Sequence, residues 1–234
     1  ELWPDDRAAG LFELRPPAGE AASSSDEAPS ELGMAGAEAL AILLHTSGTT
    51  SEPKTVALTH AGLGWGAQAV AKTLRLTPAD VCVNAMPLYH LHGLAVNLLA
   101  TVISGGSVVC LSGAVDGRRL LGCLREHSAS WYSATPTHHL QLLQAAQAER
   151  PSGAVPEGAE AWRVAGVERL RLIRNCSAAL APALATALRS AFDAAVIPSY
   201  AMTECLPIAS HPLPDDAAAH ELTEADVERL ASVG

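Results

Sequence analysis

The stretch HTSGTTSEPKT at residues 45–55 follows the apolar run ALAILLH at residues 39–45. Its small hydroxyl side chains, its glycine and its lysine are typical of a loop that binds phosphate. Hydroxyls donate hydrogen bonds, glycine lets the backbone approach an anion, and lysine supplies positive charge. When the stretch is taken alone, the alternative is a polar turn after a strand that binds no ligand.

Pro53 separates this stretch from the phosphate loop of P-loop nucleotidases. Residues 48–55 fit the pattern GxxxxGK[ST] except at Pro53, where the pattern requires glycine. Proline has no N–H to donate to a phosphate, and its φ is fixed. The helix that should begin directly after Lys54 and Thr55 is instead predicted to begin at Thr59. The sequence therefore argues against a P-loop fold.

Strands and helices are predicted to alternate along the chain. Strands are predicted at 39–45, where the strand is expected to be buried, and at 80–86, 107–111, 129–134, 170–176 and 194–200. Helices are predicted at 59–76 with Thr59 as N-cap, at 93–105, 116–128 and 181–192, and at 135–149 with Pro136 in the first turn. This alternation predicts an α/β fold with a mostly parallel, helix-covered sheet, whose ligands gather at the carboxyl ends of the strands.

The ends of the chain differ in composition from its middle. Residues 1–38 are rich in proline, serine, alanine and acid, which predicts a linker or mobile segment. Residues 39–214 form the predicted core, interrupted by a loop at 149–162. The pattern of elements fades after Glu204, and residues 215–234 are interpreted as a tail that includes a short surface helix.

The composition excludes some classes of function. The formal net charge is −10, and no cluster of lysine and arginine occurs, which argues against a nucleic-acid partner. No apolar run is long enough to span a membrane. The chain opens on Glu1 rather than methionine, which leaves its targeting undecided. The scattered cysteines form no CxxC pair, so we expect free thiols, an intracellular compartment and no zinc site. They are Cys82, Cys110, Cys123, Cys176 and Cys205.

Four segments together resemble the adenylate-forming superfamily of acyl-CoA synthetases, luciferases and peptide-synthetase adenylation domains. They are TSGTTSEPK (46–54), PLYHLHGL (87–94), LRLIRNCSAALAP (170–182) and SYAMTE (199–204), in the order that the superfamily has them. The resemblance covers roughly 40–214 and is strongest to the oxalate–CoA ligases of plants and fungi. It implies an incomplete N-terminal domain, because the superfamily's ribose-binding aspartate and the lid with its catalytic lysine would lie beyond residue 234.

The resemblance implies a site for ATP and Mg²⁺. Tyr200 would stack on adenine, Thr203 would bind the α-phosphate, and Glu204 would hold Mg²⁺ on the triphosphate. The implied nucleotide-binding residues are Thr46, Ser47, Gly48, Thr49, Thr50, Ser51, Lys54, Ala178, Ala179, Tyr200, Ala201 and Thr203. The implied catalytic residues are Lys54, His90, Thr203 and Glu204.

The resemblance also implies a site for the acid. Its residues would be His90, His92, Arg174, Cys176 and Ser177, with His90 as a wall between the acyl pocket and the CoA tunnel. A metal at the H-x-H pair is not predicted, because no third ligand is near in sequence. Two further histidines, His138 and His139, open a predicted helix and are expected at the surface or in its cap.

The implied activity is an ATP-dependent acid–CoA ligase with ATP, Mg²⁺ and coenzyme A as cofactors and a small carboxylic acid as substrate. Oxalate–CoA ligases carry a histidine shortly after the motif glutamate, whereas Cys205, Leu206 and Pro207 follow Glu204 here. Oxalate, another small acid and a fatty acid therefore stay open, as do the cytoplasm and the peroxisome. The alternatives are an adenylation domain that serves a carrier protein and a non-catalytic nucleotide-binding remnant. The 234-residue chain alone is predicted to be inactive.

Overall fold

The computed structural model describes residues 2–4, 12–14, 35–46, 54–149 and 163–213. The chain divides into two units, residues 1–35 and 36–234. In the first unit, β1 (Leu2–Pro4) pairs antiparallel with β2 (Phe12–Leu14). Neither strand was predicted, because the composition of residues 1–38 predicts a linker or mobile segment.

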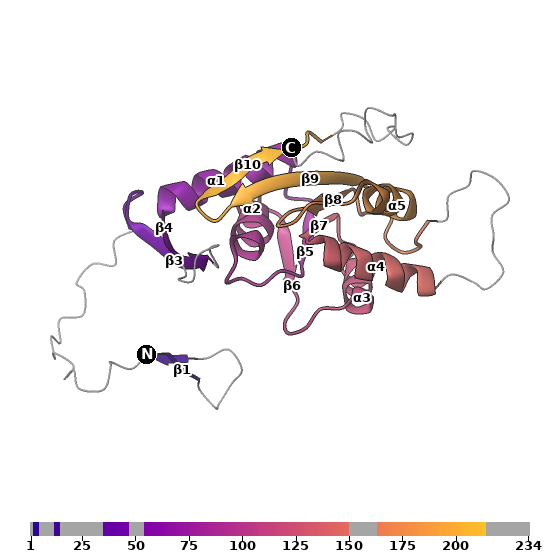
Figure 1. The fold of residues 1–234 in the computed structure, drawn as a ribbon, viewed down its shortest axis with the longest axis horizontal. Helices are drawn as coiled ribbons and strands as arrows, with labels where there is room; N and C mark the ends of the chain where they lie inside the picture. Colours follow the sequence, from indigo (N-terminus) through magenta and orange to yellow (C-terminus); the bar gives the residue numbers. More distant parts are fainter. Residues whose placement is uncertain (1, 5–11, 15–34, 47–53, 150–162, 214–234) are drawn as a thin grey trace. The chain divides into compact units, whose positions relative to one another are not determined.

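The second unit contains a six-stranded sheet (Figure 1). Its strand order is β10-β9-β8-β7-β5-β6, and every neighbouring pair is parallel except β10 and β9, which are antiparallel. The strands are β5 (Val81–Asn84), β6 (Ser107–Cys110), β7 (Trp131–Ala134), β8 (Leu172–Asn175), β9 (Ala195–Met202) and β10 (Cys205–Ser210). The predicted α/β fold with a mostly parallel sheet is confirmed.

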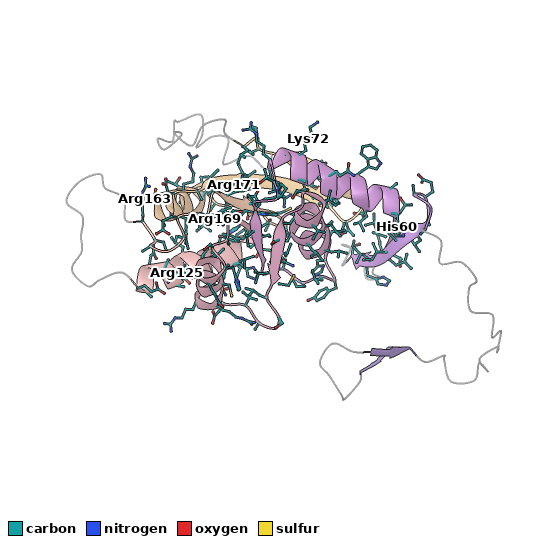
Figure 2. All side chains as sticks on the ribbon, turned by 180° about the vertical axis from the view of Figure 1, so that it is seen from behind. His60, Lys72, Arg125, Arg163, Arg169 and Arg171 are labelled. Atoms are coloured by element: carbon teal, nitrogen blue, oxygen red, sulfur yellow. The ribbon has the colours of Figure 1, made fainter. Side chains whose placement is uncertain are left out.

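In the part of the second unit that the structure describes, six helical segments connect and cover these strands. They are α1 (His60–Thr73), the π-helix η1 (His92–Leu99), α2 (Ala100–Ile103), α3 (Gly117–Glu126), α4 (Pro136–Ala148) and α5 (Pro182–Phe192). His60 and Lys72 mark the two ends of α1 in Figure 2. The predicted cap is confirmed, since the Thr59 side chain accepts a hydrogen bond from Gly62 N at 3.1 Å.

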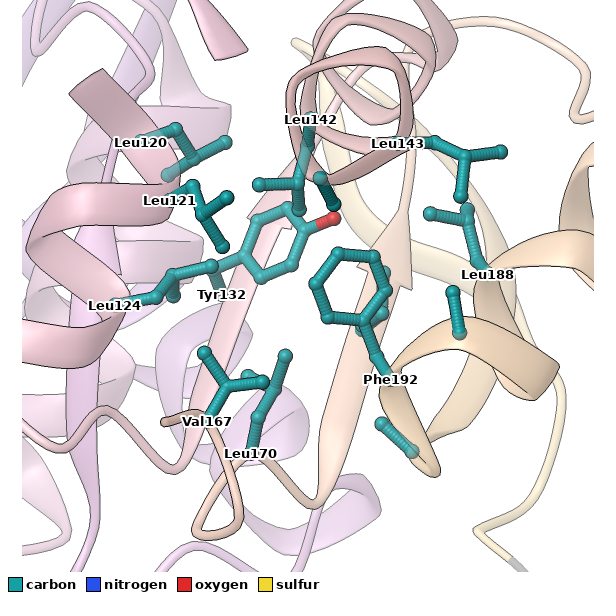
Figure 3. Close-up of a cluster of buried hydrophobic side chains, with 14 of the residues drawn as sticks. Leu120, Leu121, Leu124, Tyr132, Leu142, Leu143, Val167, Leu170, Leu188 and Phe192 are labelled. Atoms are coloured by element: carbon teal, nitrogen blue, oxygen red, sulfur yellow. The ribbon is translucent and has the colours of Figure 1, made fainter. Parts of the chain in front are cut away.

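Two hydrophobic clusters cover the two faces of the sheet. Neighbouring residues of β7 point to opposite faces, so Tyr132 belongs to one cluster and Trp131 to the other. The first cluster, shown in Figure 3, joins the sheet to α3, α4 and α5 through Leu120, Leu121, Leu124, Leu142, Leu143, Leu188 and Phe192. The second joins the opposite face to α1, η1 and α2 through Ala67, Val70, Leu74, Val96 and Ala100.

Two expectations for individual elements were wrong. The strand β3 (Leu40–Thr46) lies outside the main sheet and pairs antiparallel with β4 (Lys54–Thr59), and its Leu40 and Leu43 side chains are more than half exposed. The helix predicted at 93–105 is confirmed, and it consists of a π-helix followed by a short α-helix. Beyond Glu204, where the pattern was expected to fade, the chain forms β10 along β9. The predicted loop at 149–162 and the tail at 215–234 lie almost wholly outside the described residues.

A buried carboxylate joins the amino ends of three parallel strands. Asp80, which precedes β5, accepts hydrogen bonds from Ser130 Oγ at 2.7 Å and from Arg171 Nε at 2.9 Å. Thr77 donates to the same side chain through its N–H and its hydroxyl. Burial raises the pKa of Asp80, but these donors outweigh burial and leave the pKa below its ordinary value. Arg171, labelled in Figure 2, therefore has a structural role at the edge opposite the predicted site.

Candidate active site

A buried amide network lies at the carboxyl ends of β5 and β7, beneath η1. Asn97 Nδ2 on η1 donates to Asn84 Oδ1 at 2.8 Å and to the Ser133 carbonyl oxygen at 3.0 Å. Asn97 and Ser133 are fully buried. Sequence reasoning missed all three residues, although asparagines inside apolar stretches were an available signal. The network fixes η1 against the edge of the sheet where ligands of such folds bind.

Gly93 lets η1 begin close to the preceding segment. A Cβ atom at Gly93 would overlap the carbonyl oxygens of Pro87 and Met86. The glycine in PLYHLHGL is therefore required by this close approach of the backbone. The helix that starts here is a π-helix, a geometry that is frequent at functional sites.

His92 joins η1 to strand β7 and to the turn after β8 through its two ring nitrogens. Its Nε2 lies 2.7 Å from Ser133 Oγ, and its Nδ1 lies 3.1 Å from Ser177 Oγ. Burial, together with the positive charge of Arg174, lowers the pKa of His92 well below its ordinary value. The neutral ring has one N–H, so one of the two serines accepts a hydrogen bond from it and the other donates to it.

Arg174 is the buried charged residue of this group. It is 1% exposed, and its Nη1 donates to Ser133 Oγ at 3.4 Å. Its Nη2 has no hydrogen-bond partner among the residues that the structure describes. Cys176 lies beside it and is 4% exposed. The structure thus places both residues in the interior, beneath Ser177, which is exposed.

The turn that follows β8 carries the predicted wall residues. Ser177, Ala178 and Ala179 are exposed, and Ser177 has a φ of 73°. A left-handed backbone is uncommon for serine and has to be held by its surroundings. Asn175 Nδ2 holds this turn by donating to the Ala178 carbonyl oxygen at 2.8 Å. The hydroxyl of Ser177 is held at the same time by His92.

The two histidines of the H-x-H pair lie in different environments. His90 is exposed, and its ring centroid lies 4.6 Å from that of the exposed Tyr89. His92 is buried and bonded to two serines. In the described parts of the chain, no group of three or more histidine, cysteine, aspartate or glutamate residues could hold a metal ion.

The predicted phosphate loop joins β3 to β4, but residues 47–53 lie outside the described residues. These include the predicted ligands Ser47, Gly48, Thr49, Thr50 and Ser51. The structure does describe both ends of the loop. Thr46 pairs with Lys54, His45 pairs with Thr55, and Thr55 Oγ1 lies 3.3 Å from His45 Nδ1. Lys54 is exposed, so its ammonium group is available to an anion.

The SYAMTE segment ends β9 and forms its turn into β10. Tyr200 is 45% exposed, Glu204 is exposed, and Thr203 and Ala201 are partly buried. Leu206, two residues after Glu204, packs against a small cluster that contains Leu44 of β3 and Leu91 of the PLYHLHGL segment. The cluster joins the PLYHLHGL segment to residues that lie two positions outside the TSGTTSEPK and SYAMTE motifs, and the His92–Ser177 contact joins it to the turn after β8.

His139 was expected at the surface, and this expectation was wrong. Its side chain is fully buried, and its Nδ1 lies 2.9 Å from the hydroxyl oxygen of Tyr132. The physical reason is its place on α4, because Leu142, Leu143 and Ala146 follow at helical spacing and face the sheet. His138 is half-buried at the start of α4, with its Nδ1 2.9 Å from Thr135 Oγ1.

Comparisons with known proteins give consistent results. A model of the family described as AMP-binding enzyme matches residues 7–234. The chain is 36% identical over 178 residues to the oxalate–CoA ligase of Arabidopsis thaliana, and this match covers 75% of this chain and 32% of that protein. It is 37% identical over 172 residues to the oxalate–CoA ligase of Saccharomyces cerevisiae, and this match covers 74% of this chain and 28% of that protein. It thus spans about a third of the length of these curated relatives.

A solved structure of ATP-bound MatB from Rhodopseudomonas palustris is similar, with a TM-score of 0.63 and 29% identity. The match covers 78% of this chain and 33% of MatB. Among the helices that the structure describes, none combines the length and the apolar character needed to cross a membrane.

Proposed function

Because this chain belongs to the AMP-binding enzyme family, we propose that it is part of an ATP-dependent acid–CoA ligase. In the proposed reaction, a carboxylate oxygen attacks the α-phosphorus of ATP, displaces pyrophosphate and gives an acyl-adenylate. The thiol of CoA then attacks the acyl carbon and displaces AMP. The observation that carries the proposal is the packing of Leu44, Leu91 and Leu206 in one cluster, since each belongs to or adjoins a different motif.

The exposed residues of the site fit a nucleotide. Lys54 offers a point charge to the phosphates, and Tyr200 offers an aromatic face to adenine. Glu204 is exposed and offers carboxylate oxygens, the type of ligand that Mg²⁺ prefers. When bound, Mg²⁺ would neutralise charge on the triphosphate. ATP would therefore be held between the β3–β4 strand pair and the turn from β9 to β10, with Thr203 at the α-phosphate and with Ala178, Ala179 and Ala201 beside the adenine.

The polar residues beneath η1 favour a small polar acid over a fatty acid. A fatty acyl chain needs an apolar pocket. Here a chain of polar contacts runs from Ser177 to the His92 ring, from that ring to the Ser133 hydroxyl, and from the hydroxyl to the Arg174 guanidinium. The named activity of two relatives supports oxalate as the first acid to test. His90 would separate the acid from the CoA thiol, and Ser177 and Cys176 would border the acid.

Coenzyme A is the proposed acceptor because both of these relatives are named CoA ligases. All five cysteines are free thiols. We place the protein in a reducing compartment inside the cell on that basis, in the cytoplasm or the peroxisome.

The test is acid-dependent ATP–pyrophosphate exchange by the full-length gene product that contains this chain. The panel contains oxalate, malonate, acetate, a medium-chain fatty acid and a cinnamate, and thioester formation with CoA is followed in parallel. Exchange with oxalate or malonate supports a small polar acid. Exchange with the fatty acid alone would contradict the proposed acid, and MgATP binding without exchange would favour a nucleotide-binding remnant.

A further inference from the structure

Two buried polar atoms lie on the α4 side of the sheet without a partner that meets hydrogen-bond geometry in the described structure. They are Nε2 of His139 and Oδ1 of Asn175. The other polar atoms of the same side chains are bonded, since His139 Nδ1 lies 2.9 Å from Tyr132 Oη and Asn175 Nδ2 donates to the Ala178 carbonyl oxygen. Unpaired buried polar atoms are rare and costly, so this pair calls for an explanation.

The surroundings offer these atoms few other partners. Tyr132 and His139 are both fully buried, and Figure 3 shows the Tyr132 ring in the middle of a cluster that includes Leu121, Leu142 and Phe192. Burial lowers the pKa of His139 to about 3, and the side chain of Asn175 and the carbonyl of Ala134 oppose this shift. The imidazole is therefore neutral at physiological pH.

A neutral imidazole has one donor and one acceptor nitrogen. If Nδ1 accepts from the Tyr132 hydroxyl, the proton lies on Nε2, which can donate to Asn175 Oδ1. In the opposite tautomer Nε2 would be an acceptor like Asn175 Oδ1, and the two atoms could not pair with each other. Rotating the Asn175 amide is no solution, because Oδ1 would then face the carbonyl oxygen of Ala178.

We propose that Tyr132, His139 and Asn175 form a hydrogen-bonded relay that positions the 176–179 turn, which makes His139 a positioning residue of the site. The relay approaches the turn from the α4 face, while His92 holds Ser177 from the η1 face. The turn needs both, because Ser177 has a left-handed backbone and an exposed side chain. The role in substrate binding rests on the proposed ligase function, whereas the relay itself rests on the two outer hydrogen bonds, Tyr132–His139 and Asn175–Ala178, and on the two buried atoms between them that lack a partner.

The kinetic test uses two substitutions at one position in the full-length protein. His139→Leu removes both ring nitrogens at similar volume, and His139→Gln keeps an amide donor that reaches toward Asn175. Leucine is expected to raise KM for the acid about tenfold, the scale of one lost hydrogen bond, and glutamine to restore most of the loss. The control is His138→Leu, next to it on α4. A lower kcat with an unchanged KM would mean a smaller folded fraction and would overturn the positioning role.

A spectroscopic test decides the relay without any turnover. In ¹⁵N-histidine-labelled protein, the ring nitrogen shifts of His139 report which nitrogen carries the proton. We expect the proton on Nε2 in the wild type and a mixture of tautomers in Tyr132→Phe. A proton on Nδ1 in the wild type would overturn the relay. If no acid supports exchange, the proposed function fails, and this measurement still decides the relay.

Discussion

Nδ1 of His92 lies 3.1 Å from the hydroxyl oxygen of Ser177, 85 residues later in the chain. This contact joins the π-helix to the turn after β8, and Nε2 of the same ring reaches Ser133 at 2.7 Å. His92→Leu should lower kcat/KM for the acid by about 10- to 100-fold, because two hydrogen bonds to the neutral ring are lost. His127→Leu, at an exposed histidine, is the control. Equal values of kcat/KM in the two variants would contradict a role of His92 in the site.

Substitution of Asp80, which lies far from the site, should lower the stability of the fold. Asp80→Asn removes the charge that pairs with Arg171 and weakens the contacts with Ser130 and Thr77. We expect the free energy of unfolding to fall by about 2 kcal/mol, less than for a fully buried pair because Arg171 is partly exposed. Urea unfolding measures it, with the exposed Glu126→Gln as control. A shift of the urea midpoint no larger than that of the control would contradict a stabilising role of the Asp80 contacts.

Two glycines in α3 should respond to alanine in opposite directions. A Cβ atom at Gly117 would overlap the carbonyl oxygen of Gln141 on α4, whereas no atom lies within 4 Å of one at Gly122. Gly117→Ala should cost about 2 kcal/mol through overpacking. Gly122→Ala should stabilise the helix by about 0.5–1 kcal/mol. Thermal unfolding of the two variants tests this, and a stable Gly117→Ala protein would show that α3 and α4 pack less closely.

The buried His139 predicts a loss of stability in mild acid. Its pKa is about 3 in the folded protein and about 6.5 when unfolded, so the unfolded chain binds the extra proton between these values. The free energy of unfolding should therefore fall as pH drops below 6.5, by about 2 kcal/mol at pH 5 from this group. Urea unfolding at pH 7.5 and pH 5 measures the difference. His139→Gln should reduce it, and an unchanged pH dependence would contradict the buried neutral ring.

The sequence predicted the main sheet well because the signals for it are local. Apolar runs at β5, β6, β7 and β8 alternate with amphipathic segments, and Thr59 stands at the start of α1. The pairing of β3 with β4 was missed, since the apolar run 39–45 is equally typical of a buried strand of the main sheet. Nothing within that run indicates that its partner lies just beyond the predicted phosphate loop.

The sequence predicts candidate site residues within its motifs, but it does not predict the polar residues of the site that lie outside them. Asn84, Ser133 and Asn97 come from three elements that only the fold brings together, so their contacts have no local signal. His139 was different, because its spacing to Leu142, Leu143 and Ala146 already places it on the apolar face of a helix. The start of a helix predicts the surface or the cap for a histidine, but in this helix the spacing to the apolar residues decides its place.

The most direct test of the ligase proposal is ATP–pyrophosphate exchange by the full-length protein with its preferred acid, in wild type, Lys54→Ala and Lys72→Ala. Both lysines are exposed, but only Lys54 lies at the end of the predicted phosphate loop. We predict acid-dependent exchange that Lys54→Ala lowers by roughly 10²-fold, the scale of losing one charge-stabilising group, and that Lys72→Ala leaves unchanged. Exchange by Lys54→Ala at the wild-type rate would contradict the account.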